Sequence, residues 1–269
     1  MKQQTVEQWK WVDVDPMETI LHGAQAGEDN AGGLPRAMAL YDAGQLEEAL
    51  AELARVLTSG SATLEANYAR GHIQFELNRF EEAAASYAAV IAADPEHPSA
   101  HYNLGVCLEK LRQWAGAEES FRKALRMNPA LSQARVGLGA CLLHQDRPEE
   151  ALAAFEQAQP QAAGDELELF GRAVALQVLS RYAEAQTVYE QLLAINPESE
   201  EALANLIAMG IARYDPKTVT EYSRQLLQVR PQSRQAQQGL ATLALWNGRG
   251  DTKSTPPAPD RRAPRLVEA

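Results

Sequence analysis

A pattern of small, aromatic and proline residues that returns every 34 residues constrains this chain more than any other feature. The most complete copy, in residues 97–129, holds the pattern at Leu104, Gly105, Leu108, Ala117, Phe121, Ala124 and Pro129. Copies start at residues 30, 64, 98, 132, 166 and 200 without insertion or deletion, and a half-copy starts near residue 234. A fixed period of about 20–50 residues is typical of a fold in which one small unit is stacked many times.

Each copy predicts two helices that pack against each other, because it has two stretches with apolar residues at helical spacing. In most copies the eighth and twentieth positions hold small residues, which let two helix backbones approach closely. An aromatic ring fills the twenty-fourth position at Tyr87, Phe121, Phe155 and Tyr189. Proline ends the second helix at Pro95, Pro129, Pro197 and Pro231. One hairpin cannot bury its apolar face alone, so we expect stability to come from contacts between neighbours.

This pattern resembles that of the tetratricopeptide repeat family over about residues 30–247. The resemblance implies an all-α, right-handed α-solenoid of about six 34-residue helix-turn-helix repeats, closed by a capping helix at about residues 234–247. It also implies that the first helix of every repeat lines a concave groove. Because proteins of this family serve many unrelated partners, the resemblance specifies the fold closely and the function only in general terms.

Three segments depart from the repeat. Residues 1–29 hold Trp9, Trp11, an acidic stretch and a short predicted helix at 17–25; this segment is interpreted either as a cap over the first repeat or as a docking segment for another subunit. Residues 248–269 are rich in proline and charge, which predicts a disordered tail. Pro160 should stop the second helix of the fourth repeat early, so that residues 159–166 form either a longer loop or a hinge.

Composition and charge exclude several classes of protein. The net charge of −11 argues against a general nucleic-acid-binding protein, which needs a basic face. No run of about 18 apolar residues predicts a membrane-spanning helix, and the first residues lack the apolar core of a signal peptide. Two cysteines in 269 residues do not form a disulfide scaffold. These features predict a cytoplasmic protein.

The sequence offers little for catalysis, cofactors or metals. It contains no phosphate-binding loop, dinucleotide glycine fingerprint or nucleophile elbow. His97 and His101 are four residues apart, but no third ligand follows at a useful spacing. Cys107 and Cys141 occupy the same position in consecutive repeats, which should separate them by about 10 Å, too far for a disulfide. We therefore expect no enzyme activity, no cofactor and no metal site.

The concave groove is the candidate functional site. The helical period turns positions 2, 5, 6, 9, 12 and 13 of each repeat towards it, and many of these residues are aromatic or apolar. The candidate partner-binding residues are Tyr68, His72, Phe75, Tyr102, Asn103, Val106, Lys110, Val136, Phe170 and Asn205. An alternative is that the aromatic residues pack between adjacent first helices as core. In similar proteins an asparagine at position 6 grips a peptide backbone, but Gly137 and Gly171 interrupt any continuous series here.

These observations predict a non-enzymatic adaptor or scaffold that binds an extended or helical segment of a protein partner within a bacterial multiprotein complex. The charges predicted in the groove are mostly acidic, which favours a neutral, apolar or basic partner segment. Two alternatives stay open. One is a scaffold that assembles with itself, because a solenoid has open ends and residues 1–29 could insert into a neighbouring copy. The other is a targeting or regulatory subunit of an enzyme complex.

Overall fold

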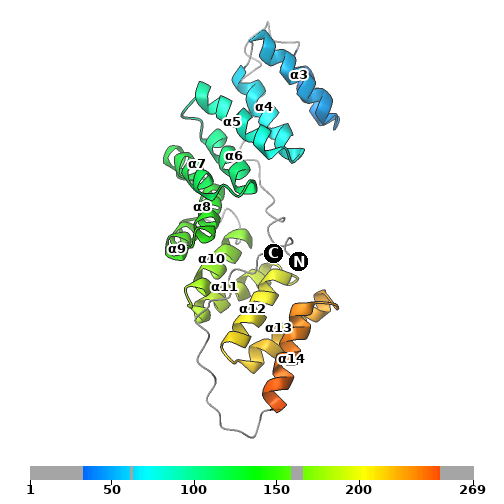
Figure 1. Cartoon of the computed structure of the whole chain (residues 1–269), viewed down its shortest axis with the longest axis vertical. Coiled ribbons are helices and arrows are strands. Elements are labelled where there is room, and N and C mark those ends of the chain that lie inside the picture. The colour runs from blue at the N-terminus through cyan, green and yellow to red at the C-terminus, as the bar shows by residue number, and fades with distance from the viewer. Residues whose placement is uncertain (1–32, 61–62, 159–165, 249–269) are drawn as a thin grey trace. The chain divides into compact units, whose positions relative to one another are not determined.

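The computed structural model describes residues 33–60, 63–158 and 166–248, shown as coloured ribbons in Figure 1. These residues form thirteen helices and no strand, and the helices are paired in hairpins that follow the 34-residue period. The prediction of an all-α fold built from helical repeats is confirmed. The predicted N-terminal segment, the loop or hinge and the proline-rich tail lie largely or wholly outside the described residues, and those predictions stay open.

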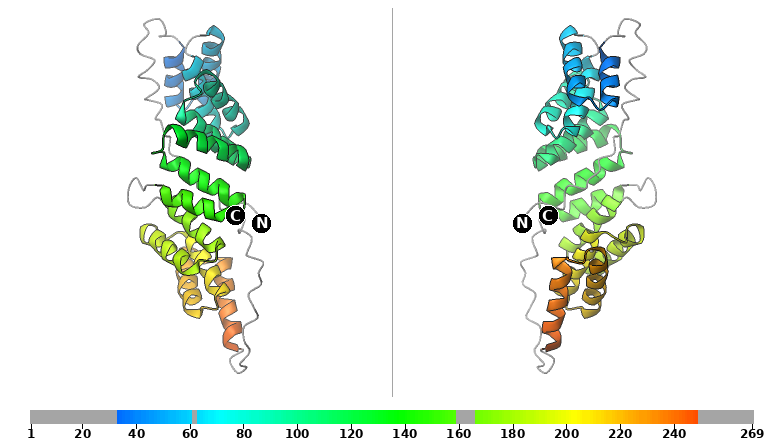
Figure 2. Two further views of the ribbon diagram at one scale, coloured as in Figure 1. Left: turned by 90° about the vertical axis from the view of Figure 1, so that its left-hand side faces the viewer. Right: turned by 90° about the vertical axis from the view of Figure 1, so that its right-hand side faces the viewer.

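The helices fall into two compact units, each considered by itself. The described part of the N-terminal unit, residues 33–147, contains α2 (Leu34–Asp42), α3 (Leu46–Ser59), α4 (Thr63–Glu76), α5 (Phe80–Ala93), α6 (Pro98–Lys110), α7 (Trp114–Met127) and α8 (Ser132–His144). The C-terminal unit contains α9 (Pro148–Gln157), α10 (Glu166–Val178), α11 (Tyr182–Ile195), α12 (Glu200–Ala212), α13 (Pro216–Val229) and α14 (Arg234–Gly248). Within each unit successive helices stack side by side (Figure 2).

The first helices of the repeats are α2, α4, α6, α8, α10, α12 and α14, and the others are second helices. Every first helix from α2 to α12 ends in the same turn. The fifteenth residue of each repeat has positive φ, between 55° and 74°, at Gly44, Asn78, Arg112, Asp146, Ser180 and Tyr214. The next backbone N–H reaches back five residues, as in the bond from Gln113 to the Leu108 carbonyl at 2.8 Å. This bond is typical of helix ends closed by a left-handed residue.

Small residues and rings form the core between repeats. The ring of Phe121 is fully buried between α6 and α8, where it lies against Gly105 and Gly137. A Cβ added at Gly105 would come within 2.8 Å of the ring, and one added at Gly137 within 2.6 Å. Phe155 meets Gly171 in the same way. The glycines of position 6 therefore have a packing role, because the ring from the preceding second helix occupies the space of their missing side chains.

Candidate functional site

The structure places four of the ten candidate groove residues in the core. Tyr68, Tyr102, Val106 and Val136 are at most 3% exposed. Their side chains pack between helices and cannot serve as surface anchors, so the expectation that they line an open groove needs this correction. The physical reason is that rings of the second helices cover the two tyrosines: Tyr68 packs against Tyr87 at a centroid distance of 5.5 Å, and Tyr102 packs against Phe121 at 5.9 Å. The other six candidates, His72, Phe75, Asn103, Lys110, Phe170 and Asn205, are half-buried.

Tyr68 contacts the candidate residue Asn103 on the next first helix. Its ring makes an edge contact with Tyr87 at a centroid distance of 5.5 Å and stacks on His97 at 5.4 Å. Its hydroxyl accepts a hydrogen bond of 2.9 Å from the side-chain amide of Asn103 on α6. Tyr68 therefore joins α4 to α6 and fixes the orientation of the Asn103 amide, which is half-buried at position 6.

A second polar link joins α2 to α4. The Tyr41 hydroxyl donates to Glu76 Oε1 at 2.7 Å and lies 3.0 Å from His72 Nε2. Because the single hydroxyl proton goes to the carboxylate, His72 donates to Tyr41. His72 Nε2 also lies 3.2 Å from Glu76 Oε1. The side chains of His72 and Glu76 are 17% and 38% exposed, so this link is accessible at its edge.

Apolar surface adjoins these polar links. Phe75, on the same helix as His72 and Glu76, packs edge-on against Phe80 at 5.3 Å and remains half-buried. Six half-buried or exposed residues of α2, α4 and α6 form what we call the first-helix face of the N-terminal unit: Tyr41, His72, Phe75, Glu76, Asn103 and Lys110. The face combines one large apolar side chain, an amide, charged groups of both signs and hydrogen-bonding rings.

The corresponding candidates in the C-terminal unit are arranged differently. Phe170 on α10 makes an edge contact with the buried Tyr189 at 6.1 Å. The Asn205 amide donates to the Glu201 carbonyl of its own helix at 2.9 Å, so this donor is engaged within α12. Asn103 and Asn205 share position 6 but have different partners, and only the first links two repeats.

A buried carboxyl group on α6, next in sequence to Lys110 of this face, was not among the residues predicted from the sequence. Glu109 on α6 is 4% exposed, and its Oε2 has no hydrogen-bond partner among the residues that the structure describes. Burial raises the pKa of Glu109 from 4.5 to about 8, although the charge of Lys110 acts in the opposite direction. Glu109 occupies position 12 of its repeat, which the helical period turns towards the groove, so the sequence pattern did not predict a buried carboxyl group there.

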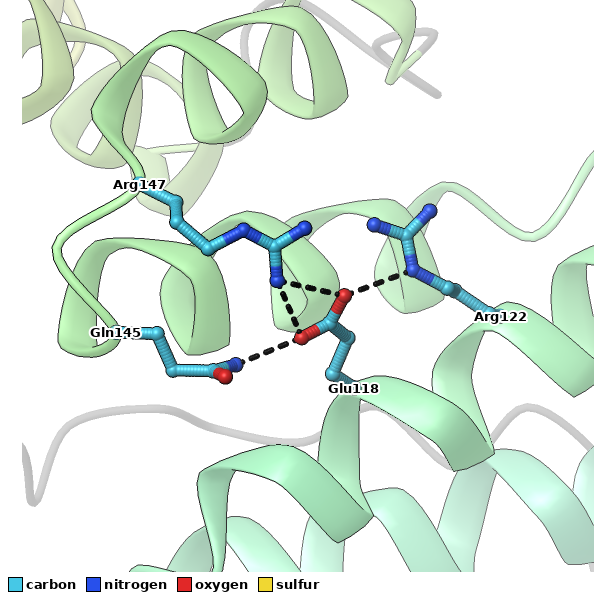
Figure 3. A network of polar contacts seen from close by, with 4 residues as sticks. All are labelled: Glu118, Arg122, Gln145 and Arg147. Atoms are coloured by element: carbon cyan, nitrogen blue, oxygen red, sulfur yellow. Dashed lines mark hydrogen bonds and ion pairs between the residues drawn. The ribbon is translucent and has the colours of Figure 1, made fainter.

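A polar network joins α7 to the turn after α8 (Figure 3). The carboxylate of Glu118 accepts hydrogen bonds from Arg122, Gln145 and Arg147 at 2.8–3.0 Å. Burial raises the pKa of Glu118, but the hydrogen bonds and the Arg147 charge outweigh it, so that the net shift is downward. These residues tie the third repeat to the fourth, and their role is structural.

The two histidines bond to nearby backbone groups, and the two cysteines are buried in the core. His97 caps α6 by accepting a hydrogen bond from the Ala100 N–H at 3.2 Å, and His101 Nε2 bonds to the Pro95 carbonyl at 3.0 Å. Cys107 and Cys141 are buried free thiols, and burial raises the pKa of Cys107 to about 12. Within the described ranges, no three His, Cys, Asp or Glu side chains gather as metal ligands. None of the helices in these ranges has the length and apolarity needed to cross a membrane.

The described residues form a protein built from stacked helical hairpins. Residues 34–89, 68–131 and 108–166 match the tetratricopeptide repeat family. The matched stretches overlap, and the helices beyond residue 166 continue the same period. The chain therefore belongs to the tetratricopeptide repeat family. A comparison with curated protein sequences found no match.

Solved structures share this fold at low sequence identity. PilF from Pseudomonas aeruginosa is 18% identical, with a TM-score of 0.65, covering 84% of this chain and 98% of PilF. MamA from Desulfovibrio magneticus RS-1 is 18% identical, with a TM-score of 0.61, covering 65% of this chain and 98% of the MamA chain. YrrB, described as a tetratricopeptide repeat protein with an unusual peptide-binding site, is 19% identical, with a TM-score of 0.59, covering 65% and 91%. At these identities the likeness extends to the fold.

Proposed function

We propose that this protein is a non-enzymatic adaptor or scaffold, and that the first-helix face of its N-terminal unit binds a segment of a partner protein. The observation that carries this proposal is the combination, on adjacent first helices, of half-buried Phe75 with the oriented Asn103 amide. An amide can both donate to and accept from a peptide backbone, and an adjoining apolar ring can anchor one side chain.

The inter-repeat links favour tight binding because they hold the face in place before a partner arrives. Tyr41 joins α2 to α4, and Tyr68 joins α4 to α6. A preformed surface loses little conformational entropy on binding. Glu76 at the exposed edge adds negative charge, which favours a neutral, apolar or basic segment over an acidic one.

The test compares the full chain with the double variant His72→Ala, Asn103→Ala in affinity purification from the native host, with bound proteins identified by mass spectrometry. Tyr102 is left unchanged because it is buried, so that its truncation would disturb the core. The control is Arg126→Ala, at an exposed position on α7. We expect the double variant to capture roughly tenfold less of at least one protein than the wild type does, as loss of a central contact predicts. The control should capture the same amount of that protein as the wild type.

The melting temperatures of the variants must stay near that of the wild type for the comparison to be valid. If the double variant folds normally and captures the same proteins as the wild type and the control, the first-helix face is not the binding site.

A further inference from the structure

The second helix of one repeat binds the following repeat through positions that recur along the chain. In the first repeat, Glu47 at position 18 of α3 pairs with Arg79, which precedes α5. In the third, Glu118 at position 21 of α7 pairs with Arg147 at 2.8 Å. In both junctions the second helix provides the acid, and the next repeat provides an arginine at position 16.

The C-terminal unit uses the same surface. Gln186 at position 21 of α11 accepts a hydrogen bond of 3.1 Å from Arg213 of the next repeat. Glu190 at position 25 of α11 accepts one of 3.0 Å from Tyr222 on α13. Positions 18, 21 and 25 of a second helix therefore form the surface on which the next hairpin sits.

On α13 this surface is hollow. Positions 18, 21 and 25 of the sixth repeat are Lys217, Thr220 and Arg224, and together with Pro216 and Glu221 they line a hollow of about 560 Å³. Among the described residues the seventh repeat provides its first helix, α14, and no second helix. The hollow thus lies on the surface that contacts the next repeat at the junctions after the first, third and fifth repeats. Lys217 and Arg224 stand at positions 18 and 25, where Glu47 and Glu190 of earlier second helices are acidic, and Glu221 lines the hollow beside them.

Large apolar side chains are exposed on α14 and in the turn that precedes α13. Tyr214, two residues before Pro216, is 45% exposed and lies 5.4 Å from the Trp246 ring on α14. Leu245 is 65% exposed, more than the other exposed large apolar residues of the described structure. Leu245 occupies position 12, where Phe75 and Ile211 of earlier repeats are half-buried. Leu245 is therefore exposed because nothing among the described residues follows α14, as expected for an uncovered packing surface.

The chain that follows α14 is a poor match for this surface. Residues 256, 257, 259 and 264 are prolines, which do not favour a helix. Residues 248–269 have five basic and three acidic side chains, whereas the basic residues of the hollow favour an acidic ligand.

The other end of the sequence matches it better. Asp13, Asp15 and Glu18 supply three acidic groups within six residues. Asp15 followed by Pro16 is typical of a helix start. The apolar residues that follow have the i, i+3, i+4, i+7 spacing of one helix face, at Met17, Ile20, Leu21 and Ala24.

We propose that the hollow on α13 binds residues 13–25 of a second copy of this chain. The acidic groups of the segment pair with Lys217 and Arg224, and its apolar face covers Leu245. Because the segment precedes the first repeat, a copy bound in this way continues the array of repeats after the sixth. The contact joins two different surfaces, so that it can be repeated from copy to copy.

The test measures the average mass of the full chain by light scattering over a roughly hundredfold concentration range. We expect the wild-type mass to rise with concentration. Lys217→Glu with Arg224→Glu should raise the concentration needed for association at least about tenfold, and Asp13→Lys with Asp15→Lys and Glu18→Lys should do the same. An equimolar mixture of these two variants should associate again, because each contributes one reversed surface.

The control is Lys123→Glu with Arg126→Glu on α7. It changes the net charge by the same amount as the α13 variant but leaves the residues of the hollow unchanged. A fluorescently labelled peptide of residues 13–25 provides the direct probe, and it should bind the wild type and the α7 variant but not the α13 variant. A mass that stays monomeric at all concentrations, association that is unaffected by the α13 substitutions, or failure of the mixed variants to associate would overturn the proposal.

Discussion

At the scale of single residues, the space around each glycine decides which substitutions the repeats tolerate. Gly105 lies against the Phe121 ring, which Gly137 confines from the other side. Gly116 has as its nearest neighbour the end of the Leu108 side chain, at 3.3 Å from an added Cβ. A confined aromatic ring cannot move away, whereas the end of a leucine can.

Gly105→Ala should therefore lower the free energy of unfolding by about 1–3 kcal/mol, as overpacking of a core does. Gly116→Ala, the matched control in the same repeat, should be neutral or stabilising by up to about 1 kcal/mol through helix propensity. Urea denaturation followed by circular dichroism measures both. Equal effects of the two substitutions would show that the ring does not confine Gly105.

Glu109 makes the stability depend on pH. Because burial raises its pKa to about 8, the folded state holds a proton that the unfolded state loses above about pH 4.5. The contribution of the protonated Glu109 to the free energy of unfolding is complete below pH 4.5 and is lost as the pH rises through 8. The free energy falls by at most about 1.4 kcal/mol per pH unit.

Glu109→Gln cannot ionise, so the decline in stability between pH 5 and 8 should be shallower than in the wild type. Urea denaturation at several pH values measures the slope, with Glu119→Gln, an exposed position on α7, as the control. Parallel curves for the wild type and Glu109→Gln would mean that Glu109 does not titrate in this range.

At the scale of elements, the turn at position 15 defines the hairpins. Gly44 has a φ of 74°, and an added Cβ there would meet no atom within 4 Å. Any loss of stability on replacing Gly44 therefore comes from the backbone conformation of the new residue. The later repeats place non-glycine residues in the same conformation, among them Asn78 and Arg112, so the hairpin contacts are strong enough to impose it.

Gly44→Ala should cost about 1 kcal/mol of stability, the usual penalty for a left-handed alanine. Gly44→Asn should cost less, because asparagine tolerates this conformation and occurs there in the second repeat. Thermal unfolding of both variants measures the difference. A smaller loss for alanine than for asparagine would contradict this reading of the turn.

The second helices also show how one residue ends an element. The sequence predicts that Pro160 stops the second helix of the fourth repeat early, and α9 ends at Gln157 after 10 residues. The second helices of the other repeats have 14 residues. Whether the residues that follow form a hinge is a question outside the described structure.

At the scale of the whole molecule, each repeat contacts mainly its neighbours in sequence. Stability in such a stack is a sum of repeat and interface contributions. A local defect should therefore have local effects.

Phe121→Leu, which removes a fully buried ring between α6 and α8, should raise amide hydrogen exchange in α6, α7 and α8. Exchange in α13 should stay at the wild-type rate, because that helix packs against α12 and α14 of the other unit. Hydrogen exchange measured by mass spectrometry separates the two regions. An equal rise in both would show that the chain unfolds as one cooperative body.

The sequence by itself determined the repeat, its period and the two-helix unit, because a stack of identical hairpins repeats the same small residues, rings and prolines at the same places. It also located the faces of the helices, since helical periodicity fixes which positions lie together. It did not determine the burial of Tyr68 and Tyr102, which belong to the core, because this depends on how closely the rings of the second helices approach them. The tertiary structure alone likewise decided the links through Tyr41 and Glu118 and the burial of Glu109. The two links join side chains about 30 residues apart, and the burial of Glu109 depends on which side chains surround its carboxyl group. The spacing of residues along the chain does not reveal these contacts.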